Sequence, residues 1–209
     1  MAKTEFFVGI FSLGLLLVNL DFIKGDSSNE LTIFDFTTLS NLNGWTEQSD
    51  TVREVGMSKA SFVLQKTKVF QRAVFFSLLN PQPNGAGFAG YRTNTHLDLR
   101  CYSKIRLDCR GQGQNFGYKI VVRHKNQNNE PHPSFEQMFQ APNSGKFQNV
   151  DLELSNFEAY YRGRRVNNSE PLDLSNITNF EIQIYGGVYL PVKQWGVSAL
   201  EINTVKAVN

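Results

Sequence analysis

Residues that usually carry chemistry are scarce in this chain of 209 residues, which has only two cysteines and three histidines. His124 and His132 flank a polar segment, residues 125–131, and no cysteine or histidine pair near them has the spacing of metal ligands. We therefore predict no metal site, and we expect these two histidines to be solvated loop residues.

Groups suited to catalysis or to a bound cofactor are also lacking. No nucleophile elbow occurs, and Gly85–Gly87 and Gly111–Gly113 are typical of hairpin turns, because a phosphate-binding loop needs a helix after it. Asp151 and Glu153 share one face of a candidate strand, opposite two leucines, so we expect both acids to face water with no catalytic role. The sequence predicts no catalytic residue, no cofactor and a protein that is not an enzyme.

Strong charge of one sign is absent as well. The formal net charge is +2, and the lysines and arginines are dispersed, which argues against nucleic acid as a partner.

Cys101 and Cys109 stand eight positions apart. An extended chain rises about 3.3 Å per residue, so they could form a disulfide only through a turn. A disulfide and two free thiols both stay open.

One long apolar run is present, and it lies at the N-terminus. Phe6–Leu20 contains no charge, follows Lys3, and is followed by Gly25 and a polar segment. A signal-peptide core takes about 7–15 apolar residues, whereas a membrane-spanning helix takes about 20. We predict a secretory signal peptide over residues 1–25 and one domain over 26–209, with no later membrane span.

The compartment follows from that leader. We expect a protein of the secretory pathway or the extracellular space, with sequons for glycosylation at Asn167 and Asn176. An uncleaved anchor and a mitochondrial targeting segment are the alternatives. The leader fits a transit peptide poorly, because it lacks arginine and carries Glu5 and Asp21 at its flanks.

The body of the chain has the pattern of an all-β protein. Ile105, Leu107 and Cys109 alternate with polar residues. In the same way Glu181 and Gln183 alternate with apolar neighbours, which predicts one face in a core and one toward solvent. The candidate strands are Leu31–Phe36, Ala60–Leu64, Val69–Leu79, Gly87–Thr93, Lys104–Arg110, Phe116–Arg123, Ser134–Gln140, Gln148–Glu153, Asn179–Gly186 and Val197–Thr204. Strands of this kind in one domain predict a two-sheet jelly-roll sandwich.

Two features suit the binding of a partner. The segment Tyr160–Arg165 sets arginines beside aromatic rings, which suits an anionic or sugar-rich partner, although these arginines could also pair with Glu158 and Glu170. Trp45, Tyr91 and Trp195 could stack on a sugar ring at the rim of the sandwich or pack in its core. Both interpretations stay open.

A collinear set of residues carries a family resemblance over about Leu31 to Val208. The set consists of Trp45, Ser49-Asp50, Glu54-Val55-Gly56-Met57-Ser58-Lys59-Ala60, Ala89-Gly90-Tyr91-Arg92-Thr93, Leu97-Asp98-Leu99, Tyr102, Ile105–Gly113, Tyr118, Phe157, Arg162-Gly163-Arg164, Pro171-Leu172-Asp173-Leu174, Ile177, Phe180 and Leu200-Glu201-Ile202. The chain resembles the complex I intermediate-associated protein 30 family in this order and spacing. It departs from the family pattern at Gln112, where an acid often stands between two glycines, and in the run Val52–Gly56.

The resemblance implies a galactose-binding-domain-like jelly roll and a non-catalytic role. Members of the family are assembly chaperones of mitochondrial respiratory complex I that act through protein–protein contact, whereas the leader of this chain indicates a secreted relative with another protein partner. A carbohydrate-binding module, with a glycan as partner, is a further alternative. We predict that partner-binding residues gather at one edge of the sandwich, namely Trp45, Asp50, Arg92, Arg162 and Arg164.

Overall fold

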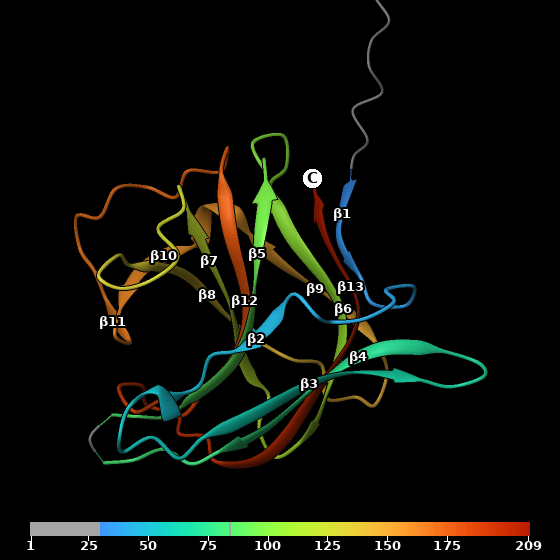
Figure 1. Cartoon of the computed structure of the whole chain (residues 1–209), viewed down its shortest axis with the longest axis horizontal. Helices are drawn as coiled ribbons and strands as arrows, with labels where there is room; N and C mark the ends of the chain where they lie inside the picture. The colour runs from blue at the N-terminus through green and yellow to red at the C-terminus, as the bar shows by residue number, and fades with distance from the viewer. Residues whose placement is uncertain (1–29, 84) are drawn as a thin grey trace, which may run out of the picture.

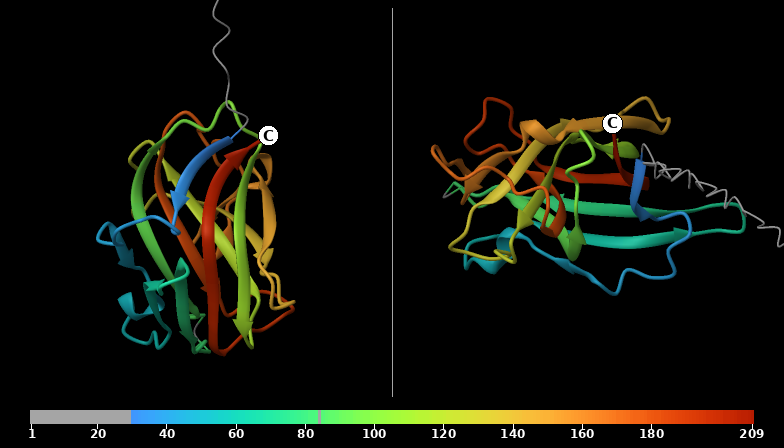
Figure 2. Two further views of the ribbon diagram at one scale, coloured as in Figure 1. Left: turned by 90° about the vertical axis from the view of Figure 1, so that its right-hand side faces the viewer. Right: turned by 90° about the horizontal axis from the view of Figure 1, so that it is seen from above.

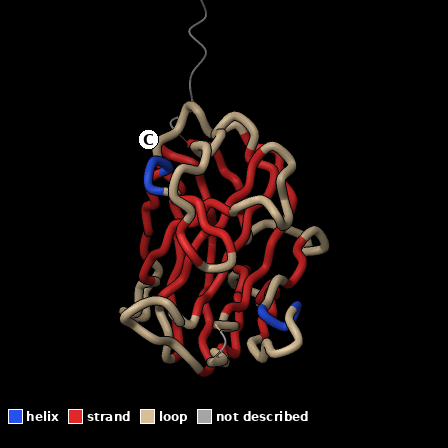
Figure 3. The backbone as a smooth tube through the Cα atoms, turned by 90° about the vertical axis from the view of Figure 1, so that its left-hand side faces the viewer, coloured by secondary structure: helices blue, strands red, loops and turns tan. Residues whose placement is uncertain are grey.

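The computed structural model describes residues 30–83 and 85–209, and this part of the chain is a β-sandwich (Figure 1). The strands are β1 (Glu30–Asp35), β2 (Trp45–Glu47), β3 (Lys59–Lys66), β4 (Gln71–Leu79), β5 (Phe88–Leu97), β6 (Lys104–Gly113), β7 (Gly117–His124), β8 (Ser134–Gln140), β9 (Gln148–Glu153), β10 (Glu158–Tyr161), β11 (Arg164–Arg165), β12 (Ile177–Tyr185) and β13 (Gly196–Val208). Two short 3-10 turns, Asp50–Val52 and Leu154–Asn156, are the only helical elements of the described part (Figure 3).

The strands form two antiparallel sheets. The six-stranded sheet has the order β3-β4-β13-β6-β9, and β1 pairs with β13 next to the C-terminus (Figure 2). The seven-stranded sheet has the order β11-β10-β8-β7-β12-β5-β2. Several neighbours, such as β12 with β5 and β7, come from distant parts of the sequence, so the jelly-roll topology gathers the strands of the site described below.

Alternating apolar residues build the core between the sheets. In β12, Phe180, Ile182 and Ile184 are fully buried, and Tyr118 and Ile120 of the neighbouring β7 are buried with them. Phe75 and Leu107 contribute from the six-stranded sheet. The buried residues recur at every second position of their strands, so the prediction of strands with one face in a core is confirmed.

Each of the ten candidate strands has a counterpart in the structure, with ends shifted by a few residues. Three short strands, β2, β10 and β11, were not expected. Both hairpin-turn predictions are wrong. Gly85–Gly87 lies in the connection from β4 of one sheet to β5 of the other, and Gly111–Gly113 is the last part of β6, paired with β13. The strand continues because β13 pairs with it as far as Gly113, and glycine is suited to position 111 because a β-carbon there would be crowded by the Phe116 ring and Ala141.

The solvated position expected for His124 is also wrong. Its side chain is buried at the end of β7, and Nδ1 accepts a hydrogen bond of 2.7 Å from the backbone N–H of Asp173. Burial lowers the pKa of His124, so the neutral ring that this bond requires is favoured. His132 is exposed in the loop, as expected.

The remaining expectations concern the cysteines, membrane spans and the N-terminal leader. Cys101 is exposed, Cys109 is buried, and both are free thiols. No helix within residues 30–83 and 85–209 is long and apolar enough to cross a membrane. The predicted signal peptide, residues 1–25, lies outside the described residues.

Candidate functional site

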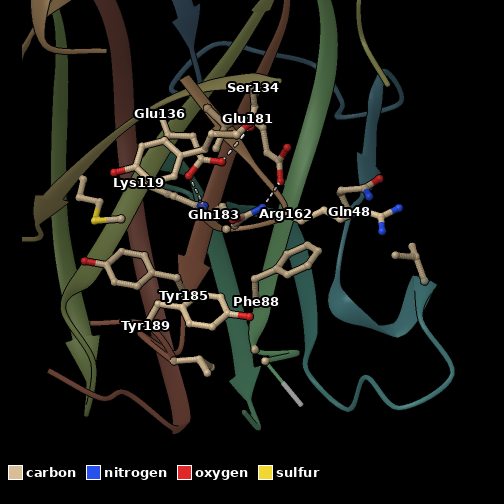
Figure 4. A pocket seen from close by; sticks show the side chains of 18 of the residues that line it. Gln48, Phe88, Lys119, Ser134, Glu136, Arg162, Glu181, Gln183, Tyr185 and Tyr189 are labelled. Carbon is tan, nitrogen blue, oxygen red and sulfur yellow. Dashed lines mark hydrogen bonds and ion pairs between the residues drawn. The ribbon is translucent and has the colours of Figure 1, made fainter. Parts of the chain in front are cut away.

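The outward face of the seven-stranded sheet is hollowed into a cavity of about 490 Å³ (Figure 4). Side chains of β5, β7, β8 and β12 form its floor. The walls come from the segment after β2, the end of the β4–β5 connection, the β7–β8 loop, the β10–β11 turn and the loop that follows β12. This volume lies within the range of about 300–1,000 Å³ that small-molecule clefts occupy.

An ion pair lies in the floor of the cavity. Lys119 and Glu136 stand on the adjacent strands β7 and β8, each about 7% exposed, with 2.5 Å between Lys119 Nζ and Glu136 Oε2. Ser134 Oγ donates a 2.8 Å hydrogen bond to the other carboxylate oxygen, Oε1. Both charges are thus compensated inside the protein, as burial requires.

Glu181 of β12 is the second buried acid of the floor, and only 3% of it is exposed. Its Oε1 accepts a 2.6 Å hydrogen bond from Gln183 Nε2, and burial raises the pKa of Glu181 to about 7. Gly90 on the adjacent β5 makes room for this carboxyl group, because a β-carbon there would lie 2.5 Å from Glu181 Oε1. Any larger residue at position 90 would displace the acid.

Three arginines, Arg53, Arg92 and Arg123, line the cavity without a carboxylate partner among the ion pairs of the described residues. Arg92 Nη1 donates to the carbonyl of Asn128 at 3.2 Å. Arg123 Nη1 donates to the carbonyls of His132 and Pro133 at 3.1 and 3.3 Å, and burial lowers the pKa of Arg123. The positive charges of Arg92 and Arg123 are held by neutral acceptors, so they stay available to an anion.

Arg162 crosses the mouth of the cavity from the β10–β11 turn. It adopts φ = +51° and is followed by Gly163 at φ = +75°, the left-handed conformations of a tight turn. Its Nη2 lies 2.6 Å from Glu130 Oε2, and this hydrogen bond lowers the pKa of Glu130. The pair is exposed and links the turn to the β7–β8 loop.

Aromatic rings make the lower wall. Figure 4 shows the rings of Tyr185, Tyr189 and Phe88 beside one another beneath the polar cluster. Tyr189 is 54% exposed, and the guanidinium of Arg164 lies 4.8 Å from the centre of its ring. The cavity therefore offers flat apolar surfaces next to charged and amide groups, a combination that is typical of small-molecule sites.

The structure separates the predicted partner-binding residues into two groups. Arg92 and Arg162 line the same cavity, and Arg164 stacks on Tyr189 of its wall. Asp50 is fully buried beside the cavity, where its carboxylate accepts from the backbone N–H of Ser58 and of Phe88. Trp45 packs in the core, with its ring 4.9 Å from that of Phe62.

The other residues singled out in the sequence form ion pairs, pack in the core or are exposed. Asp151 pairs with Arg106, Nε to Oδ1, at 2.7 Å. Arg165 pairs with Glu158 at 2.6 Å. Tyr91 packs against Phe62, whereas Trp195 is 65% exposed. Of the two sequons, Asn167 is exposed and Asn176 is half-buried.

Sequence reasoning missed the floor of the cavity, because Glu181 and Gln183 were expected to face solvent and are instead buried. One feature of the sequence could have indicated a polar cluster: Lys119 and Glu136 also stand at outward positions of strands with apolar inner faces. Nothing in the linear sequence says that these strands are adjacent.

Comparison with known proteins agrees with the fold. The chain is similar in fold to a family 11 carbohydrate-binding module from Clostridium thermocellum, solved in complex with a β-1,3-1,4-mixed-linked tetrasaccharide. The identity is 16%, the TM-score is 0.62, and the match covers 86% of this chain and 95% of the module. A family 30 carbohydrate-binding module of a Clostridium thermocellum cellulosomal cellulase matches at 12% identity and a TM-score of 0.55, over 86% of this chain and 98% of the module.

These likenesses define the class: the protein is a galactose-binding-like β-sandwich. The sequence profile of the complex I intermediate-associated protein 30 family matches residues 34–202, most of the chain. The chain belongs to this family. An uncharacterized protein of Schizosaccharomyces pombe is 30% identical over 146 residues, which cover 66% of this chain and 65% of the yeast protein. The matched part thus spans about two thirds of each protein.

Proposed function

We propose that this protein is a non-catalytic binding protein that receives its ligand in the cavity on the seven-stranded sheet. The observation that carries the proposal is the lining of that cavity, where aromatic rings adjoin buried polar groups and the rim arginines Arg92 and Arg162. Family membership supports a protein partner, because the family takes its name from association with complex I intermediates. The buried Lys119 and Glu136 of the floor are paired with each other within the protein, which suits recognition more than reaction.

We expect Arg162→Ala combined with Arg164→Ala to leave the fold intact and to weaken partner capture. Both side chains are exposed, so the midpoint of urea denaturation should stay close to the wild-type value. Loss of the guanidinium groups removes the contacts at the cavity mouth. The measurement is cross-linking mass spectrometry on the protein in its native source, alongside urea denaturation.

Arg100→Ala is the matched control, because Arg100 is an exposed arginine in an ion pair with Asp98 and does not line the cavity. It should keep all partner cross-links. Unfolding of the double variant would mean that Arg162 and Arg164 are structural. Unchanged cross-links in a folded double variant would contradict binding at this mouth.

A saccharide ligand is the second candidate function, and the rings of Tyr185, Tyr189 and Phe88 favour it. Flat rings beside carboxyl and amide groups suit the two faces of a sugar, one rich in C–H and one in hydroxyl groups. A glycan array measures this directly. Absence of any signal above background would count against saccharide binding.

We propose further that the protein acts in the secretory pathway or outside the cell, with a mitochondrial role in complex I assembly as the alternative. The apolar leader supports secretion, and family membership supports the alternative. N-terminal sequencing of the native protein should find a start near Asp26, with a glycan on the exposed Asn167. Co-localisation of a fluorescent fusion with mitochondria would contradict secretion.

A further inference from the structure

The charge lining the cavity is unbalanced. Five basic side chains line it against three acidic ones: Arg53, Arg92, Lys119, Arg123 and Arg162 against Glu130, Glu136 and Glu181. Two ion pairs, Lys119–Glu136 and Arg162–Glu130, remove two charges of each sign. Three guanidinium groups then face a single carboxyl group.

That remaining acid, Glu181, does not neutralise the arginines at mildly acidic pH. Burial raises its pKa to about 7, so most of it carries a proton at pH 6. The charged groups around it are Lys119 and Arg123 of β7 and Glu136 of β8, and its hydrogen-bond partner is Gln183. Arg92 extends from β5, the strand on the other side of β12.

The unpaired guanidinium groups of Arg92 and Arg123 indicate the chemistry of the ligand. Each donates only to backbone carbonyls of the β7–β8 loop, and the two lie close enough for the charge of Arg92 to lower the pKa of Arg123. Arginine forks bind planar carboxylates with two parallel hydrogen bonds. A carboxylate would therefore supply the negative charge that the cavity lacks.

The walls indicate what carries this carboxylate. Tyr185, Tyr189 and Phe88 present aromatic rings next to the polar groups of the floor (Figure 4). The cavity of about 490 Å³ is of the size that small ligands occupy. A sugar ring stacks its C–H face on such rings, and its hydroxyl groups can exchange hydrogen bonds with the carboxyl and amide groups of Glu181 and Gln183.

We propose that the cavity binds an acidic saccharide, with the carboxylate of a uronic acid residue held by Arg92 and Arg123 and its ring against Tyr185 and Tyr189. This inference rests on the proposed function, namely that the cavity is the binding site, and on its saccharide candidate. It names the ligand class: a uronate-containing oligosaccharide rather than a neutral one.

The test is isothermal titration calorimetry of the full mature protein at pH 6 with trigalacturonate and with its neutral counterpart, galactotriose. The wild type should bind trigalacturonate at least about tenfold more tightly, the effect of one charge-assisted arginine contact. Arg92→Gln, checked for folding by circular dichroism, should lose most of that preference. Arg100→Ala, outside the cavity, should keep it.

Titration of Glu181 supplies a second readout. As the pH rises from 6 to 8, Glu181 gains negative charge and should weaken trigalacturonate binding several-fold in the wild type. Glu181→Gln keeps a neutral hydrogen-bonding group, so its affinity should stay level over this range. The same slope in the variant would contradict the part assigned to Glu181.

The outcomes separate this inference from the proposed function. Equal or tighter binding of galactotriose would overturn the acidic ligand and leave a saccharide site. Equal binding of tetraglutamate would overturn the saccharide and favour an acidic peptide of a protein partner. Binding of none of the three, together with unchanged cross-links in the Arg162/Arg164 double variant, would overturn the cavity as the binding site.

Discussion

Trp45→Ala should destabilise the protein by about 3–5 kcal/mol, the usual cost of removing a large aromatic side chain from a core. The indole of Trp45 lies 5.0 Å from the Phe34 ring and 4.9 Å from the Phe62 ring, measured between centres, and 6.4 Å from Phe180. Phe34 and Phe62 belong to the six-stranded sheet, whereas Trp45 and Phe180 belong to the other. The indole therefore joins the two sheets, and guanidinium denaturation measures its loss.

Trp195→Ala is the control for this experiment. Trp195 is the second tryptophan of the chain and is 65% exposed, so its removal should change the free energy of unfolding by about 0.5 kcal/mol or less. A Trp45→Ala protein of wild-type stability that fails to bind its partner would contradict the core role and return Trp45 to the partner-binding residues.

Lys119→Met should cost about 3–5 kcal/mol, because it leaves Glu136 buried with no cation in contact. The ammonium group lies 2.5 Å from Glu136 Oε2, and both side chains are less than one tenth exposed. Methionine preserves most of the volume of the lysine stem, so the loss reports the missing charge rather than a cavity. Chemical denaturation at pH 7 is the measurement.

The double variant Lys119→Met with Glu136→Leu removes both charges and should recover most of that loss, since no uncompensated charge remains. The exposed Arg100–Asp98 pair is the control: Arg100→Ala should leave the midpoint of chemical denaturation close to the wild-type value. A double variant as unstable as Lys119→Met would show that packing, not charge, accounts for the effect.

Strand positions were predictable because their causes are local. The alternation of Ile105, Leu107 and Cys109 follows from the period of an extended chain with one buried face, and these residues are fully buried in β6. The short strands β2, β10 and β11 carry two to four residues each, too few for alternation to be visible. They form because a longer neighbour supplies the hydrogen-bond partners.

The same alternation misled for the outward face of β12. Glu181 and Gln183 do point away from the core, but β5 and β7 flank them, and loops from several other places in the chain wall in the cavity that they line. His124 is buried for a related reason, since the segment around Asp173 folds back onto the end of β7. Burial by distant segments leaves no periodic trace in the sequence.

The amino-acid pattern was enough to establish the all-β class, the sandwich and the family, because strand alternation and a collinear set of residues are properties of the chain read in order. The site is different. Lys119, Glu136 and Glu181 come from three strands that meet only when the seven-stranded sheet assembles. That assembly brings Lys119 and Glu136 into an ion pair, and it buries Glu181, which raises the pKa of this acid.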